Sequence, residues 1–254
     1  MNAGVPPYFT SLKPFTGLFA TGMPALIYHK LGPRPHGVRL KGLYLSRLLF
    51  ERQLSELREA GFTTPAYGLP PLREANSGRS IALTFDDGFA NVFQQGLEPL
   101  ARQGFRAIGF LVTDLIGRCN EWEVQEGEAR QPLMDETQIK EWLAAGHEIG
   151  SHTLTHPFLT RLSLQQAGEE ISASKKKLED RFGRPVRHFC YPYGDWSPAL
   201  RELVMAAGYE TACTTDFGVN TRATPPFELK RILARYQSIS FKAIRERLAR
   251  TRFR

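Results

Sequence analysis

Residues 81–89 of this chain read IALTFDDGF, an apolar run that stops at two adjacent carboxylates, Asp86 and Asp87. The apolar part is typical of a buried parallel strand, and α/β proteins place their chemistry where such strands end. Neighbouring side chains on a strand point to opposite faces, so both acids reach one site only if the chain turns as it leaves the strand. Gly88 permits that turn. Taken alone, the triplet equally fits a solvated turn.

A second stretch, residues 147–157, reads HEIGSHTLTHP and again looks like a short strand that breaks into a loop. Its His152 and His156 are four residues apart, which brings both imidazoles to one side in a helical or tight-turn conformation. Such pairs also occur as surface decoration. Together with Asp87, however, they supply two nitrogens and one oxygen, a ligand set of catalytic zinc that leaves one position open for water. Asp86 is then free to act as a base.

The rest of the chain repeats one pattern, in which a helix ends at a glycine and a strand follows. We expect helices over 46–60, 90–103, 135–146, 163–182 and 197–207, and strands over 25–30, 81–85, 105–112, 147–151, 186–193, 209–215 and 228–236. Repeated strand–helix–strand units predict a parallel sheet, either closed into a barrel or open. The long polar segment 114–134 is either a rim loop that shapes a substrate groove, with Trp122 facing a sugar, or a surface loop with Trp122 packed inward.

Length and charge favour one domain with a basic tail. The chain has 254 residues with 42% hydrophobic content and a net charge of +7, enough for one sizeable core and favourable for anionic surroundings. We expect an irregular N-terminal arm over 1–24, the main domain over 25–237, and a basic helix over 238–254. That helix fits either an anionic membrane surface or the outside of the domain. Nucleic-acid binding is not expected, because no recognised module accompanies the charge.

Cysteine usage and the N-terminus bear on the compartment. The three cysteines, Cys119, Cys190 and Cys213, match neither a disulfide framework nor a metal-binding spacing. Prolines and glycines interrupt the N-terminal region, so no signal peptide is expected, and no apolar run is long enough to cross a bilayer. The sequence therefore predicts a cytoplasmic protein, with a longer natural precursor left open.

Three segments resemble, in order, the motifs of the polysaccharide deacetylase family, whose shared unit is the NodB homology domain (carbohydrate esterase family 4). They are residues 84–88 (TFDDG), 152–156 (HTLTH) and 189–194 (FCYPYG), and weaker likeness runs from 26 to 232. The resemblance implies an α/β fold, a distorted (β/α)7-type barrel in a single domain. It also implies a metal-dependent hydrolase that removes the N-acetyl group from an amino sugar or polysaccharide.

The resemblance also implies roles for single residues. Asp87, His152 and His156 would bind a divalent metal, Zn²⁺ or another transition metal, with Asp86 as the base. The main-chain N–H of Tyr193 would hold the oxyanion. Thr153 either braces the second histidine through a hydrogen bond or is a plain loop hydroxyl.

Two departures from the family pattern leave roles open. Many members carry an arginine that pairs with the base aspartate where this chain has Cys190, and many end with a Leu-x-x-His motif, absent from residues 229–233. Arg231 would tether the base, bind an anionic substrate or lie on the surface. The general acid is then either protonated Asp86 or His29, which otherwise is a structural histidine.

Other uses of the same residues remain open at this point. Trp196 either offers a flat face to a sugar ring or is structural. A metal-dependent amidase acting on a different small amide and a non-catalytic carbohydrate-binding protein are the alternative functions. The sequence discloses neither the sugar, nor its chain length, nor the oligomeric state.

Overall fold

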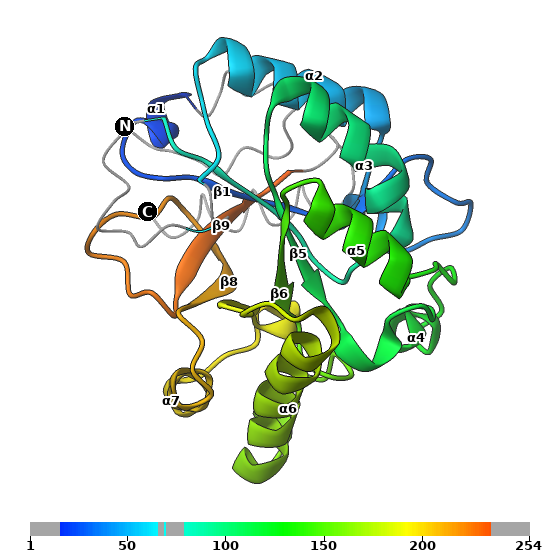
Figure 1. The fold of residues 1–254 in the computed structure, drawn as a ribbon, viewed down its shortest axis with the longest axis vertical. Coiled ribbons are helices and arrows are strands. Elements are labelled where there is room, and N and C mark those ends of the chain that lie inside the picture. Colours follow the sequence, from blue (N-terminus) through cyan, green and yellow to red (C-terminus); the bar gives the residue numbers. More distant parts are fainter. Residues whose placement is uncertain (1–15, 66–68, 70–78, 235–254) are drawn as a thin grey trace, which may run out of the picture.

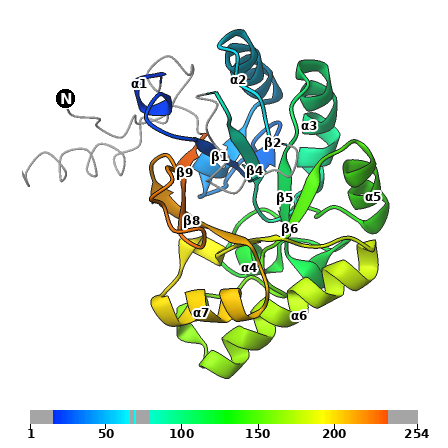
Figure 2. The same ribbon diagram turned by 60° about the vertical axis from the view of Figure 1, so that its left-hand side comes forward.

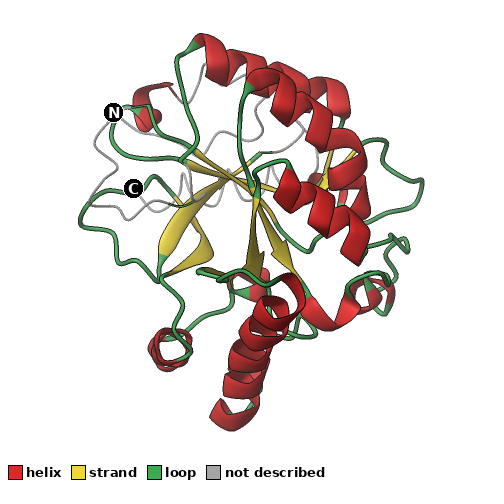
Figure 3. Ribbon diagram, viewed as in Figure 1, coloured by secondary structure: helices red, strands yellow, loops and turns green. Residues whose placement is uncertain are grey.

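Seven parallel strands close into a barrel at the centre of the molecule (Figures 1 and 3). Around the barrel they follow the order β1 (Ala25–Tyr28), β4 (Ala82–Phe85), β5 (Ile108–Leu111), β6 (Glu148–Ser151), β7 (His188–Cys190), β8 (Thr211–Phe217) and β9 (Leu229–Leu233), and β9 pairs back to β1. The structure is a computed structural model that describes residues 16–65, 69 and 79–234. The predicted (β/α)7-type barrel is confirmed.

Helices pack around the outside of the barrel. The longer ones are α2 (Arg47–Glu59), α3 (Ala90–Gln103), α5 (Glu136–Ala144), α6 (Leu164–Phe182) and α7 (Pro198–Ala206). Helices α2 and α3 lie side by side, as do α6 and α7 (Figure 2). Each of the five begins and ends within two residues of its predicted bounds. The local sequence signals are present in the structure, since Asp135 with Gln138 and Ser163 with Gln166 form capping boxes.

Several short elements lie in the connections. They are α1 (Thr16–Phe19), α4 (Glu121–Val124), the 3₁₀ turns η2 (Lys41–Leu43), η3 (Thr113–Leu115), η4 (Leu159–Arg161) and η5 (Pro192–Gly194), and a two-stranded sheet of β2 (Lys30–Leu31) with β3 (Tyr44–Leu45). Helix α1 falls within the segment expected to be an irregular arm. Residues 1–15 of that arm and the basic helix expected over 238–254 lie outside the described residues.

Alternation along the strands sorts their side chains into two cores. One cluster joins outward strand residues, such as Leu83 and Phe85, to helix residues, such as Leu54 and Trp142. The other contains no helix residue and fills the barrel: Met23, Ala25, Leu69, Ala82, Ile108, Phe110, Cys190, Cys213 and Leu229. Since alternate residues share a face, Asp86 follows Ala82 towards the barrel interior.

None of the helices in the described part of the chain is both long enough and apolar enough to span a membrane.

Candidate metal centre and active site

Asp87, His152 and His156 converge at the ends of β4 and β6. Nε2 of His152 lies 3.4 Å from Oδ1 of Asp87, and Nε2 of His156 lies 3.3 Å from the same oxygen. All three side chains are buried, and their ligand atoms lie within 4.8 Å of one another. A tetrahedral zinc ion with ligands at about 2.1 Å would separate its ligand atoms by roughly 3.4 Å. The residues therefore fit one divalent metal ion with an open coordination position.

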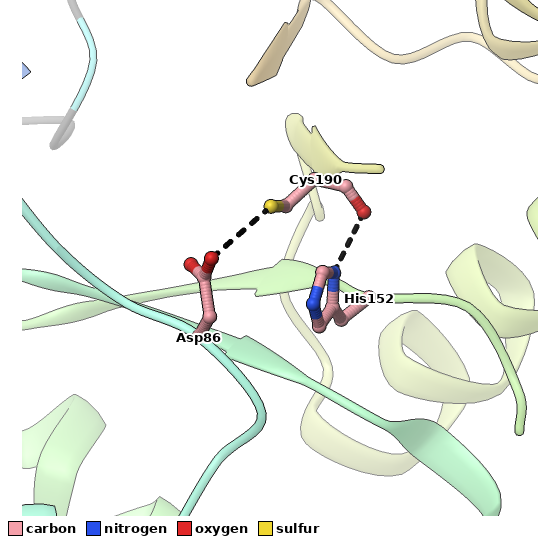
Figure 4. A group of neighbouring side chains, drawn as sticks. All are labelled: Asp86, His152 and Cys190. Atoms are coloured by element: carbon pink, nitrogen blue, oxygen red, sulfur yellow. Dashed lines mark hydrogen bonds between the residues drawn. The ribbon is translucent and has the colours of Figure 1, made fainter. Parts of the chain in front are cut away.

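The backbone of Cys190 fixes the orientation of His152. Nδ1 of His152 donates a hydrogen bond to the carbonyl oxygen of Cys190 at 2.7 Å, and Figure 4 shows this carbonyl directed at the imidazole. A carbonyl only accepts, so the proton resides on Nδ1 and Nε2 presents its lone pair to a metal. This arrangement matches the usual outer support of a metal-binding histidine.

A hydrogen-bonded turn, not a helix, brings the second histidine into place. The backbone N–H of His156 donates to Oγ1 of Thr153 at 3.0 Å, the contact expected of a bracing threonine. Glu170 of α6 supports the same turn, because its Oε2 accepts hydrogen bonds from the backbone N–H groups of Leu154 and Thr155 at 2.8 and 3.0 Å. No sequence motif singles out Glu170, because it lies on a helix whose pattern shows only amphipathicity.

Backbone strain is concentrated at this site. Among the described residues other than glycine, four have positive φ: Asp87 (74°), Thr153 (68°), His156 (67°) and Tyr193 (60°). Such conformations cost about 1–3 kcal/mol each and persist where the surrounding structure enforces them. All four residues belong to the three sequence motifs. In particular, the turn at Asp87 and Gly88 is what lets two consecutive carboxylates serve one site.

Asp86 is held by a buried arginine from the far end of the sequence. Nη1 and Nη2 of Arg231 donate to Oδ1 and Oδ2 of Asp86 at 2.7 and 2.8 Å. The remaining N–H groups of Arg231 donate to the carbonyl of Thr214, the hydroxyl of Thr84 and the sulfur of Cys190. Arg231 is 1% exposed. All five of its N–H donors form hydrogen bonds inside the barrel. Of the three roles considered for Arg231, the geometry matches the tether.

Cys190 lies between the predicted base and a predicted metal ligand. Its thiol points towards Asp86 (Figure 4), donating to Oδ2 at 3.7 Å, while Nη2 of Arg231 donates to its sulfur at 3.0 Å. Arg231, which enters from β9, therefore makes the contact with Asp86 that the family resemblance assigns to an arginine at position 190.

Charges around Asp86 keep it ionised. Burial by itself would raise the pKa of Asp86, but the ion pair with Arg231, aided by His29 and His152, holds the pKa below its usual range. His29, at the end of β1, lies with Nε2 3.9 Å from Oδ2 of Asp86. Burial lowers the pKa of His29 more than the two aspartates raise it, so its imidazole is neutral at pH 7.

The aromatic residues near the rim divide into two groups. Tyr193 is 41% exposed, stacks on Phe158 with ring centroids 3.8 Å apart, and meets the His156 ring edge to face at 4.5 Å. Trp122, in the segment whose role the sequence left open, stacks directly on His156. Trp196 instead packs against the outer core beside Tyr191. Its predicted contact with a sugar stays a prediction.

Comparisons with known proteins agree with this arrangement. The sequence model of the family described as polysaccharide deacetylase matches residues 73–212. YxkH of Bacillus subtilis (strain 168) is 26% identical over 219 residues, covering 83% of this chain and 70% of YxkH. The peptidoglycan-N-acetylglucosamine deacetylase PgdA of Listeria monocytogenes is 28% identical over 137 residues, covering 54% of this chain. The chain spans only 26% of the length of that relative.

Among solved structures, IcaB from Ammonifex degensii superposes with a TM-score of 0.72 at 25% identity, covering 88% of this chain and 95% of IcaB. The likeness therefore extends over most of the chain.

Proposed function

Since this chain belongs to the polysaccharide deacetylase family, we propose that it removes the N-acetyl group from an amino sugar of a glycan by metal-dependent hydrolysis. One observation carries the proposal: a buried Asp87–His152–His156 ligand set lies beside an ionised carboxylate, Asp86, that is not itself part of the set. A non-catalytic sugar-binding protein has no need of that fourth group. Neither alternative function gains a specific supporting contact.

The ligand set supports zinc as the metal. Two imidazole nitrogens and one carboxylate oxygen form a known catalytic zinc set, and the distances to Oδ1 of Asp87 match a tetrahedral ion. When bound, a divalent ion of this kind lowers the pKa of a water molecule towards 7 and polarises the acetyl carbonyl.

Asp86 would accept the proton of the attacking water. Its carboxylate is ionised, and Arg231 grips both of its oxygens, so the base is fixed in one orientation. General-base catalysis of this kind typically contributes ~10²–10⁴ in rate. In this proposal Arg231 is a positioning residue and makes no contact with the substrate, because it is buried and fully hydrogen-bonded.

Two further groups complete the proposed machinery. The main-chain N–H of Tyr193, in the strained turn η5, is the family's oxyanion donor by the match of its motif. The leaving nitrogen needs a proton, and Asp86 holds one after the attack. His29 is neutral at pH 7, so it would serve as the acid only by first taking that proton from Asp86, whose Oδ2 lies 3.9 Å from its Nε2.

The substrate class follows the relatives. PgdA is named for peptidoglycan N-acetylglucosamine, so we propose an N-acetylglucosamine-containing glycan. The cytoplasmic location, the contact of the basic tail with an anionic membrane and the oligomeric state stay predictions.

Release of acetate from N-acetylglucosamine oligomers tests this function. We expect release that stops on addition of a chelator and returns with zinc. A protein that binds one equivalent of zinc yet releases no acetate from any acetylated sugar would contradict the proposal.

A further inference from the structure

A row of aromatic rings in contact with one another passes through His156, the proposed metal ligand. The Trp122 ring lies against one side of the imidazole, with centroids 4.6 Å apart and planes 24° from parallel. The Tyr193 ring meets another side at 4.5 Å and 70°. Phe89 continues the row beyond Trp122 at 6.4 Å, and Phe158 continues it beyond Tyr193.

A cation closes each end of this row. Nζ of Lys30 lies 4.5 Å from the centroid of the Phe89 ring, and the guanidinium carbon of Arg161 lies 4.0 Å from that of Phe158. Both distances are within the range of favourable cation–π contacts. The rings and their terminal cations therefore form one continuous packed unit around His156.

His156 depends on this packing more than His152 does. The Nδ1 of His152 is bonded to a carbonyl, whereas the Nδ1 of His156 is buried and has no hydrogen-bond partner among the described residues. A metal-ligating histidine is normally oriented by a bond from its second nitrogen. For His156 that bond is lacking among the described residues, so its orientation depends on the contact of Nε2 with Asp87 and on the rings packed around it.

The ring of Trp122 needs an anchor of its own, because α4 contains only four residues. The adjacent Glu123 supplies one: its Oε2 accepts from Nζ of Lys30 at 2.5 Å and from Nδ2 of Asn120 at 2.6 Å. Lys30 is 0% exposed and Glu123 is 5% exposed. This ion pair ties α4 to β2, which begins directly after His29.

A second tie holds the same segment. Oε1 of Glu128 accepts the backbone N–H groups of Arg39 and Leu40 at 2.8 and 2.9 Å. Within the segment, Oδ1 of Asn120 accepts a hydrogen bond from the backbone N–H of Gln131 at 2.6 Å. The backbone around Trp122 is thus held by these side-chain contacts in addition to the few helical hydrogen bonds of α4.

We propose that Trp122 holds the His156 imidazole in its metal-ligating orientation, and that the buried Lys30–Glu123 ion pair holds Trp122 in place. Trp122, Lys30 and Glu123 are then positioning residues of the metal centre. The inference rests on the metal site of the proposed function but not on the reaction, because metal affinity is measured without substrate.

Zinc affinity, measured by competition with a chromophoric chelator, tests the role of the ring. Trp122→Phe retains a flat ring and should bind zinc within about threefold of the unaltered protein. Trp122→Leu retains apolar bulk but no stacking face, and should bind about tenfold more weakly, the lower end of the loss seen when outer support of a ligand is removed. Equal affinity of Trp122→Leu and the unaltered protein, with unchanged thermal unfolding of the metal-free forms, would overturn the proposal.

Glu123→Gln tests the anchor, and Glu121→Gln is its matched control. Both residues lie on α4, but Glu121 pairs with Arg130 at the surface, where side chains are 35% and 60% exposed. We expect weaker zinc binding and faster hydrogen exchange of residues 119–126 for Glu123→Gln only. The same affinity for both variants would overturn the role of the ion pair.

Quenching of tryptophan fluorescence by Co²⁺ gives a readout independent of stability. The chain has three tryptophans, and Trp122 is the one stacked on a proposed ligand. Trp122→Phe should lose most of the quenching, whereas Trp196→Phe should retain it. Retention of the quenching in Trp122→Phe would contradict the proposal. An unaltered protein that bound no divalent ion would overturn both this inference and the proposed function.

Discussion

Arg231 and Asp86 are separated by 145 positions in the sequence, yet they form a bidentate ion pair inside the barrel, with N–O distances of 2.7 and 2.8 Å. Closure of the barrel creates this contact, because β9 pairs with β1, and β1 pairs with β4, at whose end Asp86 lies. Inside the barrel the guanidinium also contacts the sulfur of Cys190, which lies on β7. The predictions below start from this pair.

Replacing the base tests its role directly. Asp86→Asn should lower kcat/KM for acetate release by ~10²–10⁴, because the amide cannot accept the proton of the attacking water. Zinc affinity should change little, since Asp86 is not one of the three proposed ligands. Kinetics and chelator competition on the same preparation measure both, and unchanged activity would remove Asp86 from the base role.

Removing the tether should change the pH dependence. The ion pair with Arg231 opposes burial and holds the pKa of Asp86 below its usual range, so Arg231→Met should raise that pKa. The base is active only when ionised, and the acid limb of the kcat/KM profile should therefore move to higher pH. Breaking a buried pair also costs about 3–5 kcal/mol of stability. If kcat/KM of Arg231→Met is lower at every pH but its acid limb does not shift, Arg231 does not set the pKa of Asp86.

An exchange of positions separates the tether from general packing. The double variant Cys190→Arg/Arg231→Met moves the guanidinium to the place where many family members carry it. We expect this variant to recover both activity and the acid limb of the profile relative to Arg231→Met alone. If the double variant were no better than the single one, the contact geometry of Arg231 rather than its charge would be the requirement.

Metal removal should abolish activity without unfolding the barrel, because the ligands lie on loops beyond β4 and β6 while the core lies elsewhere. Dialysis against a chelator should give an inactive protein with an unchanged far-ultraviolet circular dichroism spectrum. Titration with zinc, cobalt, nickel and manganese ions should then restore acetate release in proportion to bound metal. Activity that survives complete metal removal would contradict the proposed chemistry.

A buried histidine away from the site should make the protein acid-sensitive. Burial, aided by the charge of Arg106, lowers the pKa of His147 from 6.5 to about 4, and its Nδ1 accepts the N–H of Ala107. Below pH 6.5 His147 becomes protonated in the unfolded chain but stays neutral in the folded protein. The free energy of unfolding therefore decreases as the pH falls from 7 towards 4. At pH 5 this loss should be about 2 kcal/mol.

His147→Gln tests that assignment, because glutamine can accept the same N–H and does not titrate. Denaturant unfolding at pH 7 and pH 5 should show a smaller pH-dependent loss for the variant than for the unaltered protein. Equal losses would assign the acid sensitivity to other groups.

Much of the barrel was predictable because its signals are local. The capping boxes at Asp135 and Ser163 and the left-handed glycines at 104 and 183 set helix ends through contacts within a few residues. The sheet of β2 and β3 was not expected, since two-residue strands carry no readable alternation. Helix α4 was also missed, because it is short and a long-range contact of Glu123 with Lys30 helps to hold it.

The sequence by itself predicted the ligand set and the base, since Asp86, Asp87, His152 and His156 lie in recognisable motifs, and the structure brings these four side chains together. It left three roles open for Arg231 and two for Trp122. Only the tertiary structure decided that Arg231 grips Asp86 and that Trp122 stacks on His156. The physical reason is that both contacts join segments far apart in the chain, so they exist only once the barrel has closed.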